Sequence, residues 1–276
     1  MTCPLCDYAV LPGDAFCEEC GHPLSSPSCT ACGAAAVDQD GYCERCGLRQ
    51  PTGRDHEELA LPSGAAGVTD KGLRRSRNED AMALIAPDDG PRTIAVVCDG
   101  VASSPRADEA SALAVSTSVR ALAAGASTKE AFGLAAMAVA GLTQDPGNAP
   151  ACTYVSAEVS DGRVTLAWAG DSRAYWLPGW VQLTVDDAAP TGEITSWLGA
   201  DAGPVEPQVR TFAPSEPGLL CVCSDGLSGY LDESVPDAGE PRELARHLLK
   251  HALDSGGRDN ITIVLIPVTP SGGSDG

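Results

Sequence analysis

The chain has 276 residues and a formal net charge of −20, from 38 acidic and 18 basic side chains. A surface of that sign repels phosphate backbones and anionic lipid, which argues against nucleic acid or a membrane surface as a partner. The first residues show no basic segment followed by an apolar run, and no apolar stretch is long enough to cross a bilayer, so we expect a cytoplasmic protein.

The first 50 residues contain a repeat with a period of 26 residues. Each copy has two Cys-x-x-Cys pairs, and four thiolates in this arrangement complete a closed tetrahedral zinc site of the structural kind. The pattern resembles a double zinc ribbon, so we predict two structural Zn²⁺ ions and folding that depends on them. The ligands are Cys3, Cys6, Cys17 and Cys20 in the first copy and Cys29, Cys32, Cys43 and Cys46 in the second.

The predicted ribbons at 1–50 carry two basic side chains, Arg45 and Arg49, against seven acids. That balance favours protein docking or intramolecular regulation over nucleic-acid binding. Disulfides or a redox role are the alternatives for these cysteines, and the lack of a secretion signal argues against a disulfide framework. The polar segment 51–58 contains Pro and Gly and predicts a linker, after which a large domain extends over 59–268.

Two apolar runs in the large domain end in the dipeptide Asp-Gly. Residues 94–98 lead into Asp99, and residues 219–224 lead into Asp225. Runs of this length that are rich in β-branched residues predict strands buried on both faces. Each strand therefore carries a carboxylate to the rim of a core.

A third carboxylate, Asp259, comes just before the apolar run 261–266. If the three strands are neighbours, Asp99, Asp225 and Asp259 converge. Like charges so close repel one another and raise each other's pKa unless a cation lies between them. A hard divalent cation is the natural occupant.

Clustered arginines precede the acidic pair Glu79-Asp80. In one interpretation the acids hold a metal ion or its waters while an arginine grips a phosphate through two hydrogen bonds. The other interpretation is a charged surface hairpin, which is the commoner structure for such a segment taken alone.

The segment after Gly100 predicts the start of a helix. Ser103 or Ser104 can cap it, Pro105 suits its first turn, and the acids that follow favour the positive end of the helix dipole. A second helix begins near Ser127, where Glu130 completes a capping box.

Short apolar runs separated by Asp-Gly and Pro-Gly predict antiparallel hairpins, at 153–159, 164–169, 173–176 and 181–184. Asp171 lies at the end of one of these strands. A helix follows at 242–253, and the Ser-, Gly- and Asp-rich residues 269–276 predict a disordered tail. Helices between strand runs favour an α+β sandwich of packed antiparallel sheets with helices outside.

Taken together, five motifs in this order resemble the metal-dependent serine/threonine phosphatases of the type 2C (PPM) family. The resemblance covers residues from about 60 to 268 and implies that family's αββα sandwich. The motifs are Arg75…Asn78-Glu79-Asp80, Val97-Cys98-Asp99-Gly100, Gly170-Asp171-Ser172-Arg173, Cys223-Ser224-Asp225-Gly226 and Asp259-Asn260-Ile261-Thr262.

The resemblance implies two Mg²⁺ or Mn²⁺ ions, with a third, weaker site beside Asp171. It implies that Asp99 bridges the ions and that Asp225 anchors the second one. Arg75 matches the family's phosphate-binding arginine better than Arg77 does. The catalytic residues are then Arg75, Asp99 and Asp225, and the metal ligands are Glu79, Asp80, Asp99, Gly100, Asp171, Asp225 and Asp259.

The implied reaction is hydrolysis of phosphoserine or phosphothreonine in proteins by a metal-activated water, in a monomer that acts on a serine/threonine kinase or its target. The alternative is an inactive phosphatase-like scaffold or sensor that works through its zinc ribbons. Three departures bear on substrate access: residues 101–104 replace a glycine-rich phrase, Ala151-Cys152-Thr153 replaces a threonine-rich one, and the flap after Thr184 is shortened.

Overall fold

The computed structural model describes residues 8–9, 29, 32–34, 36–37, 42–48, 50, 54–88 and 90–270. The chain divides into two compact units, Met1–Thr52 and Gly53–Gly276. Four predicted zinc ligands, Cys3, Cys6, Cys17 and Cys20, lie outside the described residues, as does the predicted tail from residue 271. In the described part of the chain, no helix combines the length and apolarity needed to cross a membrane.

The second unit contains two large antiparallel sheets. The first has six strands in the order β1-β2-β13-β12-β8-β9, and the other has five in the order β11-β7-β6-β4-β3. The six are His56–Ala60 (β1), Ala66–Asp70 (β2), Ile261–Val268 (β13), Gly218–Cys223 (β12), Arg173–Leu177 (β8) and Val181–Gln182 (β9). The five are Gln208–Phe212 (β11), Arg163–Ala169 (β7), Tyr154–Ser160 (β6), Arg92–Cys98 (β4) and Ala81–Ile85 (β3).

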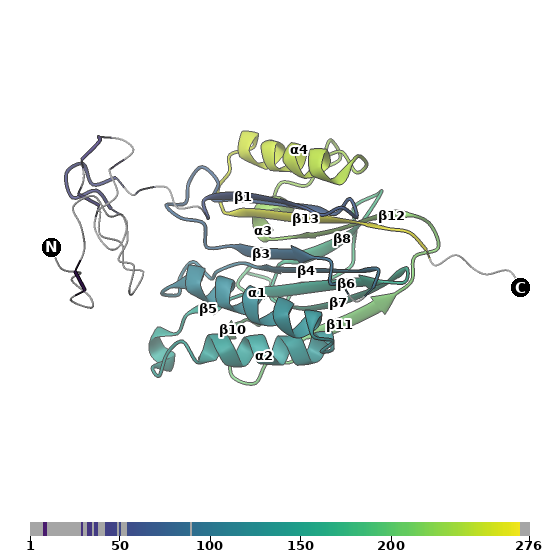
Figure 1. The fold of residues 1–276 in the computed structure, drawn as a ribbon, viewed down its shortest axis with the longest axis horizontal. Helices are drawn as coiled ribbons and strands as arrows, with labels where there is room; N and C mark the ends of the chain where they lie inside the picture. Colours follow the sequence, from purple (N-terminus) through teal and green to yellow (C-terminus); the bar gives the residue numbers. More distant parts are fainter. Residues whose placement is uncertain are drawn as a thin grey trace, which may run out of the picture. The chain divides into compact units, whose positions relative to one another are not determined.

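Helices cover the outer faces of the two sheets, which gives four layers (Figure 1). The helix α4, Pro241–Asp254, packs on the six-stranded sheet, and α1, Ala107–Ala123, with α2, Thr128–Ala140, covers the five-stranded sheet. Smaller elements are a pair of short strands, Ala151–Cys152 (β5) and Leu198–Gly199 (β10), the 3-10 helix Pro146–Asn148 (η1) and the one-turn helix Asp225–Ser228 (α3). The predicted αββα sandwich is confirmed.

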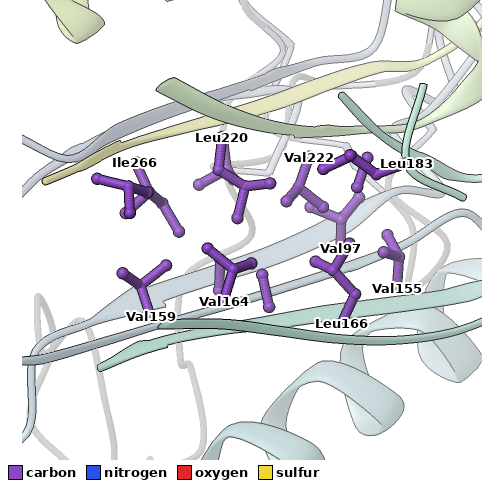
Figure 2. Close-up of a cluster of buried hydrophobic side chains, with 14 of the residues drawn as sticks. Val97, Val155, Val159, Val164, Leu166, Leu183, Leu220, Val222 and Ile266 are labelled. Carbon is purple, nitrogen blue, oxygen red and sulfur yellow. The ribbon is translucent and has the colours of Figure 1, made fainter. Parts of the chain in front are cut away.

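Aliphatic side chains from both sheets fill the space between them (Figure 2). Leu220 and Val222 of β12 lie in this layer with Val97 of β4. The alternate residues of β12, Cys221 and Cys223, are fully buried on the other face, in the cluster under α4. The strand is therefore buried on both faces, as its continuous apolar sequence predicts.

The strand β1 begins at His56, inside the segment 51–58 that its polar composition assigns to a linker. His56 pairs with Asp70 in the antiparallel register of β1 and β2, and its Nδ1 lies 2.9 Å from Asp70 Oδ2. Ladder pairing with β2 thus draws polar residues into this strand.

The start of α1 differs from the prediction. Its N-cap is Arg106, with a φ of 50° and no capping hydrogen bond from its side chain, so the expected cap by Ser103 or Ser104 is wrong. Ser104 Oγ instead accepts a hydrogen bond from the backbone N–H of Ala151 at 3.1 Å. The Ser104 hydroxyl, which the sequence predicts as a helix cap, is therefore hydrogen-bonded to β5. The capping box of Ser127 and Glu130 on α2 is confirmed.

Candidate active site

Three acidic residues at strand ends meet at one edge of the sandwich. Because β12 pairs antiparallel with β13, with Cys223 opposite Ile263, the end of β12 lies beside the start of β13. Asp225 and Asp259 therefore come from one sheet. Asp99 follows β4 of the other sheet. The acids therefore converge from two different sheets. The sequence prediction instead assumed that their strands are neighbours.

These acids line a cavity of about 180 Å³. Its walls also contain the predicted phosphate-binding arginine, a fourth carboxylate and residues of the three segments in which the sequence departs from the family pattern. The lining residues are Arg75, Asp99, Gly100, Val101, Ala102, Thr153, Asp171, Ile194, Asp225 and Asp259.

The carboxyl groups of the cavity are strongly perturbed. Burial, followed by repulsion from Asp80 and Asp225, raises the pKa of Asp99 well above its usual range. Burial with repulsion from Asp259 raises the pKa of Asp225 to about 6. The pKa of Asp171 is also raised, again mainly by burial. Concentrating negative charge in this way is unfavourable unless a cation compensates it.

Asp80 does not line the cavity but is buried close enough to affect its electrostatics. Its Oδ2 accepts hydrogen bonds from Ser224 Oγ at 2.8 Å and Thr262 Oγ1 at 2.7 Å. Burial raises the pKa of Asp80 to about 7, although these two hydrogen bonds oppose the shift. Glu79 also lies outside the cavity wall, and burial raises the pKa of its carboxyl.

The two candidate arginines have different partners. Arg75 lines the cavity and donates two hydrogen bonds to Asp259, from Nε to Oδ1 at 2.7 Å and from Nη2 to Oδ2 at 2.6 Å. Arg77 lies 3.4 Å from Asp108 of α1 and is absent from the cavity wall. Of these two arginines, Arg75 is the one that lines the cavity.

Both Asp-Gly dipeptides require glycine for steric reasons. A Cβ on Gly226 would lie 1.8 Å from the backbone oxygen of Asn260, and one on Gly100 would lie 2.7 Å from the backbone oxygen of Glu79. Backbone atoms cannot yield as a flexible side chain does. The glycines thus let two distant segments approach the residues that follow β4 and β12.

Sequence reasoning missed the residues that orient these acids. Thr153 Oγ1 accepts a hydrogen bond from the backbone N–H of Asp99 at 3.0 Å, and it lies 2.7 Å from Ser172 Oγ. Asn260 accepts from the backbone N–H of Glu79 at 2.8 Å. Ser172 and Asn260 each directly follow an acid in one of the five family motifs. That position was the one sequence feature that could have indicated their role.

The donor set fits a hard divalent cation. The cavity offers carboxylate and backbone oxygens, and Asp225 Oδ1 and Asp80 Oδ1 are buried without a hydrogen-bond partner among the described residues. Oxygen-only ligands suit Mg²⁺ or Mn²⁺, and Mg²⁺ retains several waters, so its ligands need not touch one another. Among the described residues, the acids do not form a group as tight as that of the four cysteines Cys29, Cys32, Cys43 and Cys46.

Four cysteines of the first unit form a compact group. Ligand atoms of Cys29, Cys32, Cys43 and Cys46 all lie within 4.8 Å of one another, which makes them the one such group of three or more His, Cys, Asp or Glu within the described ranges. The backbone N–H of Cys32 donates to Cys29 Sγ at 3.4 Å, the kind of bond that stabilises a thiolate. This geometry suits the tetrahedral zinc site predicted for the second repeat.

Comparison with known families agrees with this picture. A model of protein phosphatase 2C matches residues 73–261, and a model of the double zinc ribbon matches residues 3–47. The chain belongs to the protein phosphatase 2C family and carries a phosphatase domain of that type. Both resemblances noted from the sequence are confirmed. No curated protein sequence matches the chain.

Solved structures with the same fold include bacterial serine/threonine phosphatases. The catalytic domain of PstP, in complex with two manganese ions, has a TM-score of 0.62 and 25% identity, covering 74% of this chain and 97% of that one. The Mycobacterium smegmatis PPM phosphatase MsPP has a TM-score of 0.63 and 28% identity, covering 75% and 99%. PppA, a regulatory component of the Pseudomonas aeruginosa T6SS, has a TM-score of 0.63 and 26% identity, covering 74% and 96%.

Proposed function

We propose that the chain hydrolyses phosphoserine and phosphothreonine in proteins, with two Mg²⁺ or Mn²⁺ ions at the cavity and a third near Asp171. The observation that carries this proposal is the meeting of four carboxylates and Arg75 around one small cavity. The two manganese ions of the PstP catalytic domain support the choice of metal. The metal-binding residues are Glu79, Asp80, Asp99, Gly100, Asp171, Asp225 and Asp259.

When bound, the ions supply Lewis-acid activation of water and neutralise charge on the phosphate. The residues of the chain do the positioning. Thr153 holds the backbone of Asp99, while Ser224 and Thr262 hold Asp80 through its Oδ2. Fixed carboxylates of this kind cost no reorganisation during the reaction.

Arg75 presents a planar guanidinium that matches a phosphate through two parallel hydrogen bonds. Its Nε and one Nη2 hydrogen donate to Asp259, which leaves the Nη1 hydrogens and the second Nη2 hydrogen for a phosphate. Among the described residues, no cysteine or histidine lines the cavity. Cys98 is fully buried outside it, and burial raises the pKa of its thiol well above the usual range. Direct attack by water therefore suits the site better than a covalent enzyme intermediate.

For the first unit, we propose that two zinc ribbons at 1–50 serve protein docking or regulation of the phosphatase. The phosphatase domain at 59–268 and the tail at 269–276 complete the proposed organisation. Strand β1 extends that domain back to His56, so only residues before His56 are left as a linker. The acidity of the ribbons supports a protein partner over nucleic acid. A cytoplasmic, monomeric phosphatase of signalling proteins is consistent with these features.

The test is metal-dependent turnover by the full-length chain. With Mn²⁺ it should release phosphate from p-nitrophenyl phosphate and from a phosphothreonine peptide, and Asp225→Asn should lower kcat/KM by about 100-fold or more while preserving the circular dichroism spectrum. Asp254→Asn, on the exposed side of α4, is the matched control. An inactive wild type, or equal rates in wild type and Asp225→Asn, would contradict the proposal.

A further inference from the structure

A second, larger cavity adjoins the candidate active site. Its volume is about 460 Å³, and it shares Val101 and Ile194 with the wall of the metal cavity. Both shared residues come from segments in which the sequence departs from the family pattern, the loop after Gly100 and the shortened flap. A peptide whose phosphorylated residue occupies the first cavity will therefore place a neighbouring side chain at the second.

The charge of this second cavity has one sign. Glu193 and Asp201 line it, and among the residues that the structure describes no lysine or arginine does. Within the part of the chain that the structure describes, neither carboxylate forms an ion pair, and Glu193 Oε2 accepts a hydrogen bond from Thr191 Oγ1 at 3.4 Å. Both side chains are exposed and therefore accessible to a ligand.

An aromatic side chain completes the wall. Trp197 lines the cavity, and its Nε1 donates a hydrogen bond to Asp201 Oδ1 at 2.9 Å, which fixes the indole against the carboxylate. An indole beside carboxylates attracts a guanidinium or ammonium group through its π face as well as through charge. Val101 and Pro105 offer apolar surface for the methylene stem of such a side chain.

We propose that this cavity is a specificity subsite that binds an arginine or lysine close in sequence to the phosphorylated residue. The inference rests on the proposed phosphatase function and adds the substrate class: phosphopeptides with a basic flank. Arginine is favoured over lysine because its planar guanidinium stacks on an indole and pairs with carboxylates. The phosphate would then occupy the metal cavity and the basic side chain would occupy the acidic second cavity. This arrangement sets the register of the peptide.

The experiment compares phosphothreonine peptides that differ only in flanking residues, with Arg, Gln or Glu within three positions on either side. Wild type should show a KM roughly fivefold lower for the Arg series than for the Gln series, with similar kcat, and the difference should shrink as salt is raised. Glu193→Gln and Asp201→Asn should each bring the two series to within about twofold. Asn at position 201 can still accept the indole hydrogen bond, so its effect reports the charge.

Glu206→Gln is the matched control, because Glu206 lies outside both cavities in an exposed pair with Lys129. It removes the same charge and should leave the Arg preference intact. Loss of preference in this variant too would assign the effect to net charge and overturn the subsite.

Two further measurements separate this inference from the proposed function. Hydrolysis of p-nitrophenyl phosphate, which has no flank, should be the same in wild type and the subsite variants. Binding of fluorescein-labelled Arg and Gln peptides to Asp225→Asn, followed by anisotropy, reports the subsite without turnover. A wild type active on the aryl phosphate but indifferent to the flank, or equal binding of the two peptides, overturns the subsite alone.

Discussion

Arg75 and Asp259 form a two-point ion pair, with donor–acceptor distances of 2.7 and 2.6 Å, although 184 positions separate them in the chain. The proposed phosphate-binding group is therefore held by a proposed metal ligand. The hydrogen bonds from Arg75 to Asp259 raise the pKa of the guanidinium, so it stays charged. Metal binding therefore involves Asp259 of this pair, and phosphate binding involves Arg75.

Replacing Arg75 by Ala should have two opposite effects. The KM for p-nitrophenyl phosphate should rise by about tenfold or more, because a two-point contact with the phosphate is lost. The affinity for Mn²⁺ should increase by a few-fold, because Asp259 is released from a competing cation. Steady-state kinetics and calorimetric Mn²⁺ titration measure the two effects. Arg77→Ala, which removes the contact with Asp108, should change neither. Weaker Mn²⁺ binding in Arg75→Ala would show that the ion pair does not oppose the metal.

The stability of the protein without Mg²⁺ or Mn²⁺ should fall as pH rises from about 4 to 7. Burial raises the pKa of Asp80 to about 7 and that of Asp225 to about 6, both from 3.8. The folded state then binds more protons than the unfolded state in this window, so deprotonation costs stability, by about 1.4 kcal/mol per pH unit for each group at most. Above about pH 8 the contribution of Asp80 and Asp225 levels off.

Urea unfolding of protein dialysed free of Mg²⁺ and Mn²⁺, between pH 4 and 8, tests this dependence. Asp80→Asn should flatten the slope, because Asn accepts the bonds from Ser224 and Thr262 without titrating. Added Mn²⁺ should restore stability above pH 7, since the cation compensates the ionised carboxylates. Stability that rises over this window in the metal-free wild type would contradict the charge arrangement.

Gly226→Ala should destabilise the phosphatase domain by about 3 kcal/mol, because the new Cβ would clash with the backbone oxygen of Asn260. Gly133→Ala on α2 is the control: its Cβ meets nothing within 4 Å, and alanine in a helix should raise stability by about 0.5–1 kcal/mol. Chemical denaturation compares the two. Similar stabilities would mean that the approach of Gly226 to Asn260 is not needed for folding.

Metal analysis of the purified chain should find two zinc ions per molecule, resistant to mild chelation. Cys43→Ser should lower this to one, because Cys43 belongs to the four-sulfur group of the second repeat. Cys223→Ser is the matched control, since Cys223 is buried in the sandwich core far along the chain from the ribbons and should retain both ions. Equal zinc content in the two variants would argue that the cysteine group is not a zinc site.

Continuous apolar runs and a capping motif predicted their secondary-structure elements correctly. The runs at 94–98, 219–224 and 261–266 correspond to β4, β12 and β13, and the capping box at Ser127 starts α2 as predicted. The strands β3 and β11 were not predicted, and each is an edge strand of the five-stranded sheet. Their pairing with β4 and β7 supplies the stability that their own sequences do not reveal.

The candidate site shows the same division. The acids, the Asp-Gly dipeptides and Arg75 were named from the sequence, and the structure places Arg75, Asp99, Asp171, Asp225 and Asp259 around one cavity. The sequence did not assign an orienting role to the hydroxyl and amide residues beside these acids. A threonine or serine beside an acid has no distinctive sequence signal, because hydroxyl residues are common and their role depends on which strand they face.

The sequence by itself determined the zinc-ligand spacing, the continuous apolar strands and the acids that end them, because each depends on residues a few positions apart. Only the tertiary structure decided that Asp99 faces Asp225 from the opposite sheet, that Arg75 pairs with Asp259, and that Thr262 holds Asp80 across 182 positions. These relationships arise when two sheets bury a common apolar layer. The packing of the sheets brings segments that are distant in the chain together at the edge of the sandwich. A local sequence pattern does not show which distant segments will meet.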